Sequence, residues 1–253
     1  MENNTLSFDN ICIATHAGLE RQGPGCLETT EKALGFIGDL GNILRVADLG
    51  CGTGGQTLVL ARMIKGDIVG VDLSPEFIEV FNDNAQKHGL HQRVAGVVGS
   101  MEDLSFLREE FDLIWSEGAI DAIGFEEGIA SWKHFLKDDG YIAVTCPSWL
   151  TDEQPEEVAK FWGDAGSKLD TIEHNIEALQ RAGYRFVAAF ALPETCWTDH
   201  YFVPRTEAEE ALLKQNAGNK IAEEYIQISK CEMELHAKHG KHYGYVFYIG
   251  KKL

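Results

Sequence analysis

The ten residues from Val46 to Gly55, VADLGCGTGG, constrain the fold of this chain more than any other stretch. Their apolar residues predict a buried strand that ends in the carboxylate of Asp48 and a glycine turn. An apolar pattern with helical spacing begins directly after the turn. Glycines at such a turn let the backbone approach a ligand closely, with a helix N-terminus behind it. The stretch therefore predicts a ligand site at the junction of a strand and a helix.

Two classes of ligand fit this turn. Gly50, Gly52 and Gly55 have the spacing of the dinucleotide fingerprint, and Asp72 follows at about the distance that this fingerprint requires. A dinucleotide would bring its pyrophosphate near Asp48, and two like charges about 4 Å apart cost about 4 kcal/mol at an effective dielectric of about 20. S-adenosylmethionine (SAM) carries an ammonium and a sulfonium, which a carboxylate attracts, and a ribose whose hydroxyls suit Asp72. The charges therefore favour SAM.

Further motifs support this interpretation. VADLGCGTGG and the later VGVDLSPEFI resemble the first two motifs of class I SAM-dependent methyltransferases. The likeness continues through VVGSMEDLSF, FDLIWSEGAI and LKDDGYIAVT, in the family's order, over about residues 44–146. The resemblance implies a doubly wound α/β fold with a mostly parallel seven-stranded sheet in the order 3-2-1-4-5-7-6, whose last strand is antiparallel. It also implies SAM as the cofactor, while the methyl acceptor is left open.

A single methyltransferase domain is expected for the 253 residues. We expect residues 1–43 to form an N-terminal helical lid, residues 44–146 the SAM-binding core, and residues 147–253 the half on the substrate side. A long, mostly helical stretch over 206–239 is an insertion before the closing strand, because the family's core joins its last two strands tightly. This insertion is expected to cover the substrate site or to form a dimer interface.

The hydrophobic pattern places the individual elements. Strands are predicted at residues 46–49, 68–72, 94–98, 111–115, 141–145, 186–192 and 243–249. Helices are predicted at residues 26–40, 75–88, 155–165, 171–182 and 206–239. Ser74 is the expected N-cap of the helix that Pro75 begins.

The resemblance also assigns cofactor contacts. Asp72 is expected to accept both ribose hydroxyls, Met101 to contact the adenine ring, and Gly118 to leave room for the methionine part. His16 and Arg21, from the lid, are expected to reach the methionine carboxylate or the substrate. The predicted cofactor-binding residues are Arg21, Asp48, Gly50, Cys51, Gly52, Thr53, Gly54, Asp72, Leu73, Ser100, Met101, Glu102, Glu117 and Gly118.

Some of these assignments have structural alternatives. Arg21 has the alternative of pairing with a surface carboxylate in this acidic chain. Met101 has the alternative of packing in the core, and Glu102 that of capping the short helix that follows. For Asp72 the ribose is favoured over a helix cap, because Ser74 already fills that role.

Catalysis and acceptor binding are assigned to fewer residues. Methyl transfer needs mainly an in-line approach in a dry pocket, and a general base only where the acceptor arrives protonated. The candidate catalytic residues are His16, Glu117 and His200. The candidate substrate-binding residues are Trp149, Trp197 and Tyr201. Trp197 and Tyr201 lie in a predicted loop over 193–201, where the alternative is that they hold the loop against the core.

Composition narrows the classes of partner. The net charge is −18, from 40 acidic and 22 basic residues, which argues against nucleic acid and anionic membranes as partners. No apolar run is long enough to span a bilayer, and the polar start MENNTLSFDN is unlike a signal peptide. The six scattered cysteines have no C-x-x-C pair, so we expect free thiols in a reducing cytoplasm.

No metal is predicted. His236, His239 and His242 have a suggestive spacing, but Gly240 interrupts the helix between the second and third, and no further ligand pattern completes a site. Basic residues at a helix C-terminus are the favoured interpretation.

The leading functional hypothesis is methyl transfer from SAM to a small molecule, with a possible homodimer as the assembly. One alternative is a non-catalytic SAM-binding regulatory protein. The other is an NAD-dependent oxidoreductase, against which Asp48 argues. The sequence Ser116-Glu117-Gly118-Ala119 stands where amino-methylating nucleic-acid enzymes carry an Asn-Pro-Pro-Tyr-like tetrapeptide, which favours a small acceptor over nucleic acid.

Overall fold

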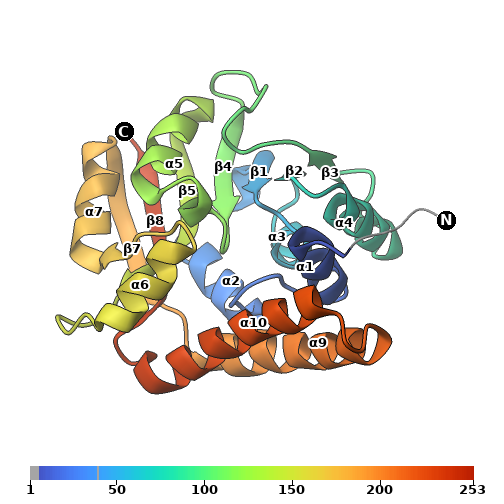
Figure 1. Ribbon diagram of the computed structural model, residues 1–253. Coiled ribbons are helices and arrows are strands. Elements are labelled where there is room, and N and C mark those ends of the chain that lie inside the picture. The colour runs from blue at the N-terminus through green and yellow to red at the C-terminus, as the bar shows by residue number, and fades with distance from the viewer. Residues whose placement is uncertain (1–5, 39) are drawn as a thin grey trace.

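A twisted sheet runs through the molecule, with helices packed against both of its faces (Figure 1). The structure is a computed structural model that describes residues 6–38 and 40–253. Residues 1–5 and 39 of the predicted lid lie outside the described residues. The strands are β1 (Arg45–Leu49), β2 (Asp67–Asp72), β3 (Val94–Val98), β4 (Phe111–Ser116), β5 (Leu136–Trp149), β6 (Asp170–Thr171), β7 (Tyr184–Ala191) and β8 (Tyr243–Lys252).

The strand order is β3-β2-β1-β4-β5-β8-β7, with the two-residue β6 paired to β5. β8 is antiparallel to both β5 and β7, and the pairs among β1 to β5 are parallel. Apart from the short β6, this is the predicted order 3-2-1-4-5-7-6, so the predicted fold class is confirmed. β5 is longer than predicted because its nine residues from Tyr141 to Trp149 all pair with β8.

The helices are α1 (Phe8–His16), α2 (Leu27–Leu34), α3 (Gly55–Met63), α4 (Pro75–Lys87), α5 (Phe125–Trp132), α6 (Glu156–Asp164), α7 (Ile172–Arg181), α8 (Glu194–Trp197), α9 (Val203–Gln215) and α10 (Lys220–His239). The Ser74 hydroxyl accepts from the amide of Phe77 and caps α4, as predicted. Two predictions are wrong. The helix expected over 26–40 ends at Leu34, and the expected loop over 193–201 is α8 followed by a π-helical turn, Thr198–Phe202.

The core lies on both faces of the sheet because successive residues of a strand point to opposite sides. Val46 belongs to one cluster and Ala47 to the other. A third, smaller cluster joins α1 to α9 and α10 through Ile11, Leu212 and Ile226. Within residues 6–38 and 40–253, no helix has both the length and the apolar character that crossing a bilayer requires.

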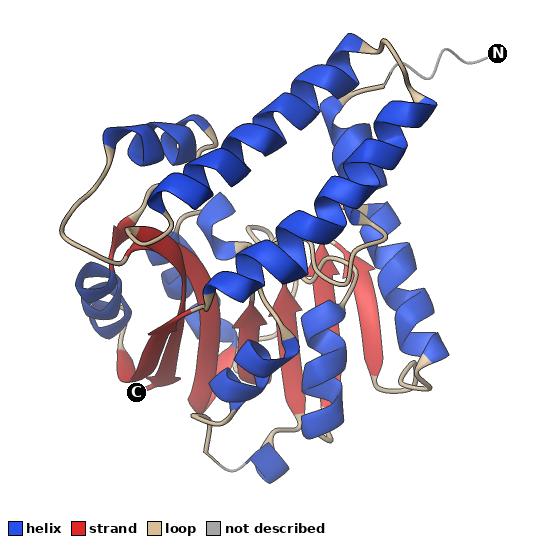
Figure 2. Cartoon of the chain, turned by 90° about the horizontal axis from the view of Figure 1, so that it is seen from below, coloured by secondary structure: helices blue, strands red, loops and turns tan. Residues whose placement is uncertain are grey.

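The predicted insertion is a helical hairpin of α9 and α10. The connection between them ends at Asn219, the N-cap of α10, whose side chain accepts from the amides of Ile221 and Ala222. Figure 2 shows the two long helices lying across the end of the sheet to which the parallel strands point. In doubly wound sheets this carboxyl end is where ligands bind. The hairpin therefore covers the side of the sheet where the site is expected.

Candidate functional site

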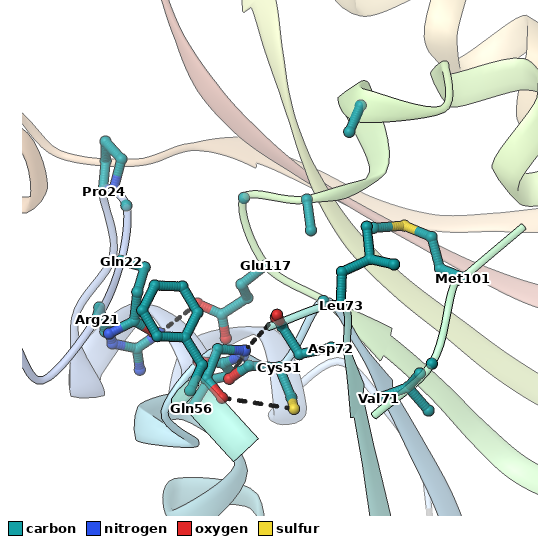
Figure 3. Close-up of a pocket in the computed structure, with 18 residues that line it drawn as sticks. Arg21, Gln22, Pro24, Cys51, Gln56, Val71, Asp72, Leu73, Met101 and Glu117 are labelled. Atoms are coloured by element: carbon teal, nitrogen blue, oxygen red, sulfur yellow. Dashed lines mark hydrogen bonds and ion pairs between the residues drawn. The ribbon is translucent and has the colours of Figure 1, made fainter. Parts of the chain in front are cut away.

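A cavity of about 250 Å³ opens at the carboxyl ends of the parallel strands. Figure 3 shows Arg21 and Glu117 on one side of it and Leu73 and Met101 on the other. Its lining comes from the lid, the turn after β1 and the ends of β2, β3 and β4. The lining residues are Arg21, Gln22, Gly23, Pro24, Gly50, Cys51, Gly52, Gln56, Val71, Asp72, Leu73, Phe77, Gly99, Met101, Glu117, Gly118, Ala119 and Ala122.

The cavity brings together nine of the predicted cofactor residues. These are Arg21, Gly50, Cys51, Gly52, Asp72, Leu73, Met101, Glu117 and Gly118. Five predicted residues do not line it: Asp48, Thr53, Gly54, Ser100 and Glu102. Sequence analysis missed nine others, of which Gln22 and Gln56 carry polar groups.

The turn between β1 and α3 requires glycine at both of the positions, 50 and 52, where a glycine lines the cavity. Gly50 and Gly52 have φ angles of +73° and +52°, a region that side chains disfavour. A Cβ on Gly50 would fall 2.2 Å from the Cβ of Ala119, and one on Gly52 would fall 2.0 Å from Oε1 of Gln22. The backbone of the turn therefore packs directly against its neighbours and forms part of the cavity wall.

Asp72, at the end of β2, is held by the backbone of this turn. Its Oδ2 accepts from the amide of Gly52 at 2.9 Å, and its Oδ1 accepts from the amide of Ser74 at 3.0 Å. These two bonds fix the orientation of the carboxylate at the cavity wall. Each oxygen has a second lone pair, so the group can accept further hydrogen bonds from a ligand.

Asp48 does not line the cavity, although SAM was favoured over a dinucleotide on the expectation that this carboxylate lies near the ligand. The residue is fully buried, and its carboxyl accepts from the hydroxyl of Thr57 at 2.5 Å and from Nε2 of Gln56 at 3.4 Å. Burial raises the pKa of Asp48 to about 7 although the Thr57 hydrogen bond lowers it, and the charge of Glu117 raises it further. Asp48 therefore ties β1 to α3, and Gln56 is the member of this group that lines the cavity.

Arg21 and Glu117 form a buried ion pair at the cavity wall. Nη1 of Arg21 lies 2.6 Å from Oε2 of Glu117, and both side chains are at most 5% exposed. Thr30 and Trp115 donate to Oε1 of Glu117 at 2.7 and 2.9 Å, and Nη2 of Arg21 donates to Thr30. Both oxygens of Glu117 are therefore engaged, whereas Nε of Arg21 is buried and has no hydrogen-bond partner among residues 6–38 and 40–253.

Gln22 fastens the lid to the glycine turn. Its Oε1 accepts from the amide of Thr53 at 2.9 Å, and its Nε2 donates to the hydroxyl of Thr53 at 2.9 Å. The same Nε2 also lies 3.2 Å from the carbonyl oxygens of His16 and Leu19. The predicted cofactor residue Thr53 thus holds the lid instead of lining the cavity.

A second cavity, of about 450 Å³, adjoins the first, and Gln22 and Phe77 line both. The lid, α6, the π-helical turn and the α9–α10 hairpin build it. Its lining is Phe8, Cys12, His16, Gln22, Phe77, Phe161, Tyr201, Arg205, Tyr225, Ile228, Ser229 and Glu232. The cavity is mostly apolar or aromatic, with one cluster of polar groups.

Arg205 organises this polar cluster. Its Nη1 lies 2.5 Å from Oε2 of Glu232 and donates to the hydroxyl of Tyr201 at 2.9 Å. The Tyr201 hydroxyl in turn lies 3.3 Å from Nε2 of His16. Arg205 also pairs with Glu209 at 3.4 Å. Sequence analysis singled out His16 and Tyr201 but missed Arg205, four residues after Tyr201, and Glu232, which α10 brings to them from further along the chain.

The protonation of His16 follows from its bonds. Its Nδ1 lies 2.9 Å from the carbonyl oxygen of Cys12, which can only accept, so Nδ1 carries a hydrogen. Burial lowers the pKa of His16 to about 4; the bond to Cys12 opposes this shift, and the charge of Arg205 adds to it. His16 is therefore neutral at pH 7, with the lone pair of Nε2 directed at Tyr201.

The remaining predicted residues lie elsewhere. Trp149 and Trp197 are 5% and 1% exposed and belong to the core, and neither lines the two cavities. Trp197 stacks on His236 at a centroid distance of 4.4 Å, which agrees with the alternative that it holds its segment against the core. His200 is exposed and also lines neither cavity.

The three histidines at the end of α10 have separate partners. His236 stacks on Trp197, Nε2 of His239 contacts Glu157, and Nδ1 of His242 contacts the hydroxyl of Thr151. Among the described residues they do not form a cluster with metal-ligand geometry.

Sequence comparisons place this chain among methyltransferases. The profile of a family described as a methyltransferase domain matches residues 41–224. A phosphoethanolamine N-methyltransferase of Triticum aestivum is 27% identical over 71% of this chain and 35% of its own length. A sterol 24-C-methyltransferase of Candida albicans is 28% identical over 58% of this chain and 41% of its own length. The chain thus spans less than half the length of these curated relatives.

Solved structures share the fold. A SAM-dependent methyltransferase from Geobacter sulfurreducens in complex with S-adenosyl-L-homocysteine matches with a TM-score of 0.81 and 21% identity, over 96% of this chain and 98% of its own. A geranyl diphosphate C-methyltransferase from Streptomyces coelicolor matches with a TM-score of 0.65 and 18% identity, over 89% and 78%. The predicted resemblance is therefore confirmed, and the chain belongs to the methyltransferase domain family, with the class I SAM-dependent methyltransferase fold.

Proposed function

We propose that this chain transfers the methyl group of SAM to a small molecule that binds in the second cavity. The observation that carries the proposal is the contact between the two cavities, which share Gln22 and Phe77. The first cavity contains most of the residues that the family motifs assign to the cofactor, and the second one opens beside it. A cofactor and an acceptor held in these cavities would lie next to each other, and direct transfer of a methyl group needs that arrangement.

The residues of the first cavity fit SAM. Asp72 would accept the ribose hydroxyls, and Leu73 and Met101 offer apolar surface to the adenine ring. The unpartnered Nε of Arg21 would donate to the methionine carboxylate, which gives this buried donor the partner that it lacks. When bound, SAM supplies a methyl group made electrophilic by its sulfonium. The NAD alternative is less suited, because Arg21 is the one cationic side chain among the lining residues and Glu117 neutralises it.

The chain's own contribution is mainly position and exclusion of water. Glu117 has both oxygens engaged, so we propose that it orients Arg21 instead of accepting a proton. His200 lies outside both cavities. His16 borders the acceptor cavity, but a pKa of about 4 makes it a weak base. We therefore propose that His16 and Tyr201 orient a polar group of the acceptor by hydrogen bonding.

The chemical class of the acceptor is inferred mainly from the residues that line the second cavity. The similar curated proteins include N-, O- and C-methyltransferases, so they do not select the acceptor atom. The mostly apolar or aromatic lining favours an acceptor with an apolar body and a polar group placed near Arg205 and Glu232.

Calorimetric titration with S-adenosylhomocysteine tests the cofactor site. One molecule should bind per chain, and Asp72→Asn should weaken binding about tenfold or more, equal to about 1.4 kcal/mol. Asparagine keeps an oxygen for a backbone amide, whereas Asp72→Ala would also leave the amides of Gly52 and Ser74 without their acceptor. Asp67→Asn, at the exposed start of β2, is the matched control and should change nothing. Binding of NADH instead of S-adenosylhomocysteine would refute the assignment.

Turnover needs its own test, because the structure of a cyclase, SpnF, matches this chain with a TM-score of 0.70 over 89% of its length. The chain should form S-adenosylhomocysteine from SAM when supplied with fractionated small-molecule extracts. Ile228→Trp, which fills the second cavity, should lower kcat/KM for the active fraction about tenfold and leave cofactor affinity unchanged. Lys230→Trp, at an exposed position of the same helix, is the control. Cofactor binding without turnover in any fraction would support the regulatory alternative.

The charge and the cysteines of the chain bear on its partners and its location. The net charge of −18 supports an enzyme that binds neither nucleic acid nor an anionic membrane surface. The six cysteines form no disulfide in the structure, which supports the predicted reducing cytoplasm. A homodimer stays a prediction, which light scattering of the purified chain would decide.

A further inference from the structure

Three potential metal ligands meet at the junction between the lid and the segment before α9, and a second thiol lies beside one of them. Cys26 precedes α2, Glu28 lies in its first turn, and His200 lies in the π-helical turn. The ligand atoms of these three residues all lie within 4.8 Å of one another. Sγ of Cys196, at α8, lies 3.5 Å from Sγ of Cys26. None of the four lines either of the two cavities.

The distance between the two sulfur atoms is informative. Two thiolates that share one tetrahedral zinc ion, each about 2.3 Å from it, lie about 3.8 Å apart. A disulfide would instead bring the sulfur atoms to about 2.0 Å. The observed 3.5 Å is close to the first arrangement and far from the second. The two thiols form a hydrogen-bonded pair, in which Cys196 donates to Cys26, and their separation also suits two thiolates that share an ion.

The chemistry of the donors selects the metal. Thiolate sulfur together with imidazole nitrogen is the ligand set that zinc prefers in proteins, and a carboxylate completes it as a fourth ligand. Cys26 and Cys196 are buried, whereas Glu28 and His200 are exposed. The two buried sulfur atoms would form the fixed base of a site, and the two exposed side chains have the rotamer freedom to close over an ion.

We propose that Cys26, Cys196, Glu28 and His200 bind a zinc ion that fastens the lid to the α8–α9 segment. An ion at this position would help to hold residues that line each of the two cavities. Gly25, next to Cys26, packs so closely that a Cβ there would lie 3.2 Å from Nη1 of Arg21. Tyr201, next to His200, borders the second cavity. The ion therefore holds together the two chain segments that carry a wall of each cavity.

Cobalt(II) is the probe that tests the site directly, because it takes the place of zinc in tetrahedral thiolate sites and absorbs light. The chain is freed of metal with a chelator and a thiol reductant and is then titrated with Co²⁺ alone. We expect one Co²⁺ per chain, a thiolate-to-cobalt charge-transfer band and the visible bands of tetrahedral cobalt. Zn²⁺ should displace the cobalt and abolish the spectrum.

Variants assign the signal to these residues. Cys26→Ser should remove most of the charge-transfer band, and His200→Ala should lower Co²⁺ affinity about 100-fold or more, because even changes beyond the direct ligands cost 10- to 100-fold. His200 is exposed, so His200→Ala should fold normally even if replacing a buried cysteine does not. Cys231→Ser and His91→Ala, both at exposed positions away from the cluster, are the matched controls and should bind as the unmodified chain does.

Thermal unfolding gives a second readout that does not depend on methyl transfer. Equimolar Zn²⁺ should raise the Tm of the unmodified chain and leave that of His200→Ala unchanged. The proposal is overturned if no thiolate band forms, if the band is undiminished in Cys26→Ser, or if His200→Ala binds Co²⁺ with unchanged affinity. It is equally overturned if thiol counting and mass analysis find a Cys26–Cys196 disulfide that persists in the reductant.

Discussion

At the scale of single residues, the cavity wall depends on charges that the fold has removed from water. Arg21 and Glu117 form one buried pair, and Arg205 with Glu232 forms another. Burying a charge is costly unless partners compensate for it. Arg21, Glu117 and Arg205 each have several partners, so removing one side of a pair should be far more damaging than breaking an ion pair at the surface.

The Arg21–Glu117 pair provides the first prediction. Arg21→Ala should lower the free energy of unfolding by about 3–5 kcal/mol, because it leaves the Glu117 carboxylate buried without its cation. Glu117→Gln introduced into this variant should recover part of the loss. Urea denaturation measures both. The control is Arg108→Ala, whose partner Glu109 and own side chain are largely exposed, with an expected effect below about 1 kcal/mol. Equal effects of the two arginine substitutions would contradict the prediction.

Asp48 provides a prediction about pH. Its pKa is about 7 in the folded chain against an ordinary 3.8, so the unfolded chain releases this proton first as the pH rises. As the pH rises from about 4 to about 7, Asp48 therefore lowers the free energy of unfolding progressively, by up to about 4 kcal/mol. Asp48→Asn should remove this part of the pH dependence, so its free energy of unfolding should rise relative to the unmodified chain over that window. A constant difference between the two chains from pH 4 to pH 8 would contradict the shifted pKa.

At the scale of elements, α1 of the lid and the hairpin form one unit. The cluster of Ile11, Leu212, Ala222 and Ile226 is separate from the two cores on the sheet. Gln22 adds a polar link from the lid to the glycine turn. The second cavity lies between this unit and the rest of the molecule, so loosening the unit should affect acceptor binding more than it affects the sheet.

Ile226→Ala tests this separation. The side chain is 3% exposed, so its truncation should cost about 2–5 kcal/mol locally. Hydrogen exchange should accelerate in α1, α9 and α10, with little change in the amides of β1 and β4. Ile228→Ala, two residues on and 49% exposed, is the control and should have a small effect on exchange. Uniform acceleration throughout the sheet would show instead that the hairpin and the sheet unfold together.

At the scale of the whole molecule, ligand binding should stabilise the chain as a unit. S-adenosylhomocysteine at about 100 times its Kd should add about 2.7 kcal/mol to the free energy of unfolding. For a chain of this size that corresponds to a rise in Tm of about 5–10 °C, measured by scanning fluorimetry. NADH at the same concentration should leave the Tm unchanged. The opposite ranking of the two ligands would favour the oxidoreductase alternative.

Much of this architecture could be predicted because its signals are local. The motif from Val46 to Gly55 predicts a strand, a turn and a helix, since apolar periodicity and glycine act within a few residues. The cap at Ser74 was predicted for the same reason. The segment over 193–201 was misjudged because its aromatic and polar residues have no clear period, and packing against α10 makes it helical. β5 exceeds its predicted length because β8, about 100 residues further on, supplies the partner for its last residues.

The sequence by itself determined the glycine turn, because backbone preferences and spacing act between neighbouring residues. Through the resemblance of its motifs to the methyltransferase family it also determined the fold class and the cofactor class, because each motif lies within a short stretch of chain. Only the tertiary structure decided that Asp48 bonds to α3 and has a pKa near 7. It also decided that Glu117 forms an ion pair with Arg21, and that Arg205 donates to Tyr201 beside His16. Hydrogen bonding and desolvation depend on which distant side chains packing brings together, and no local pattern contains that information.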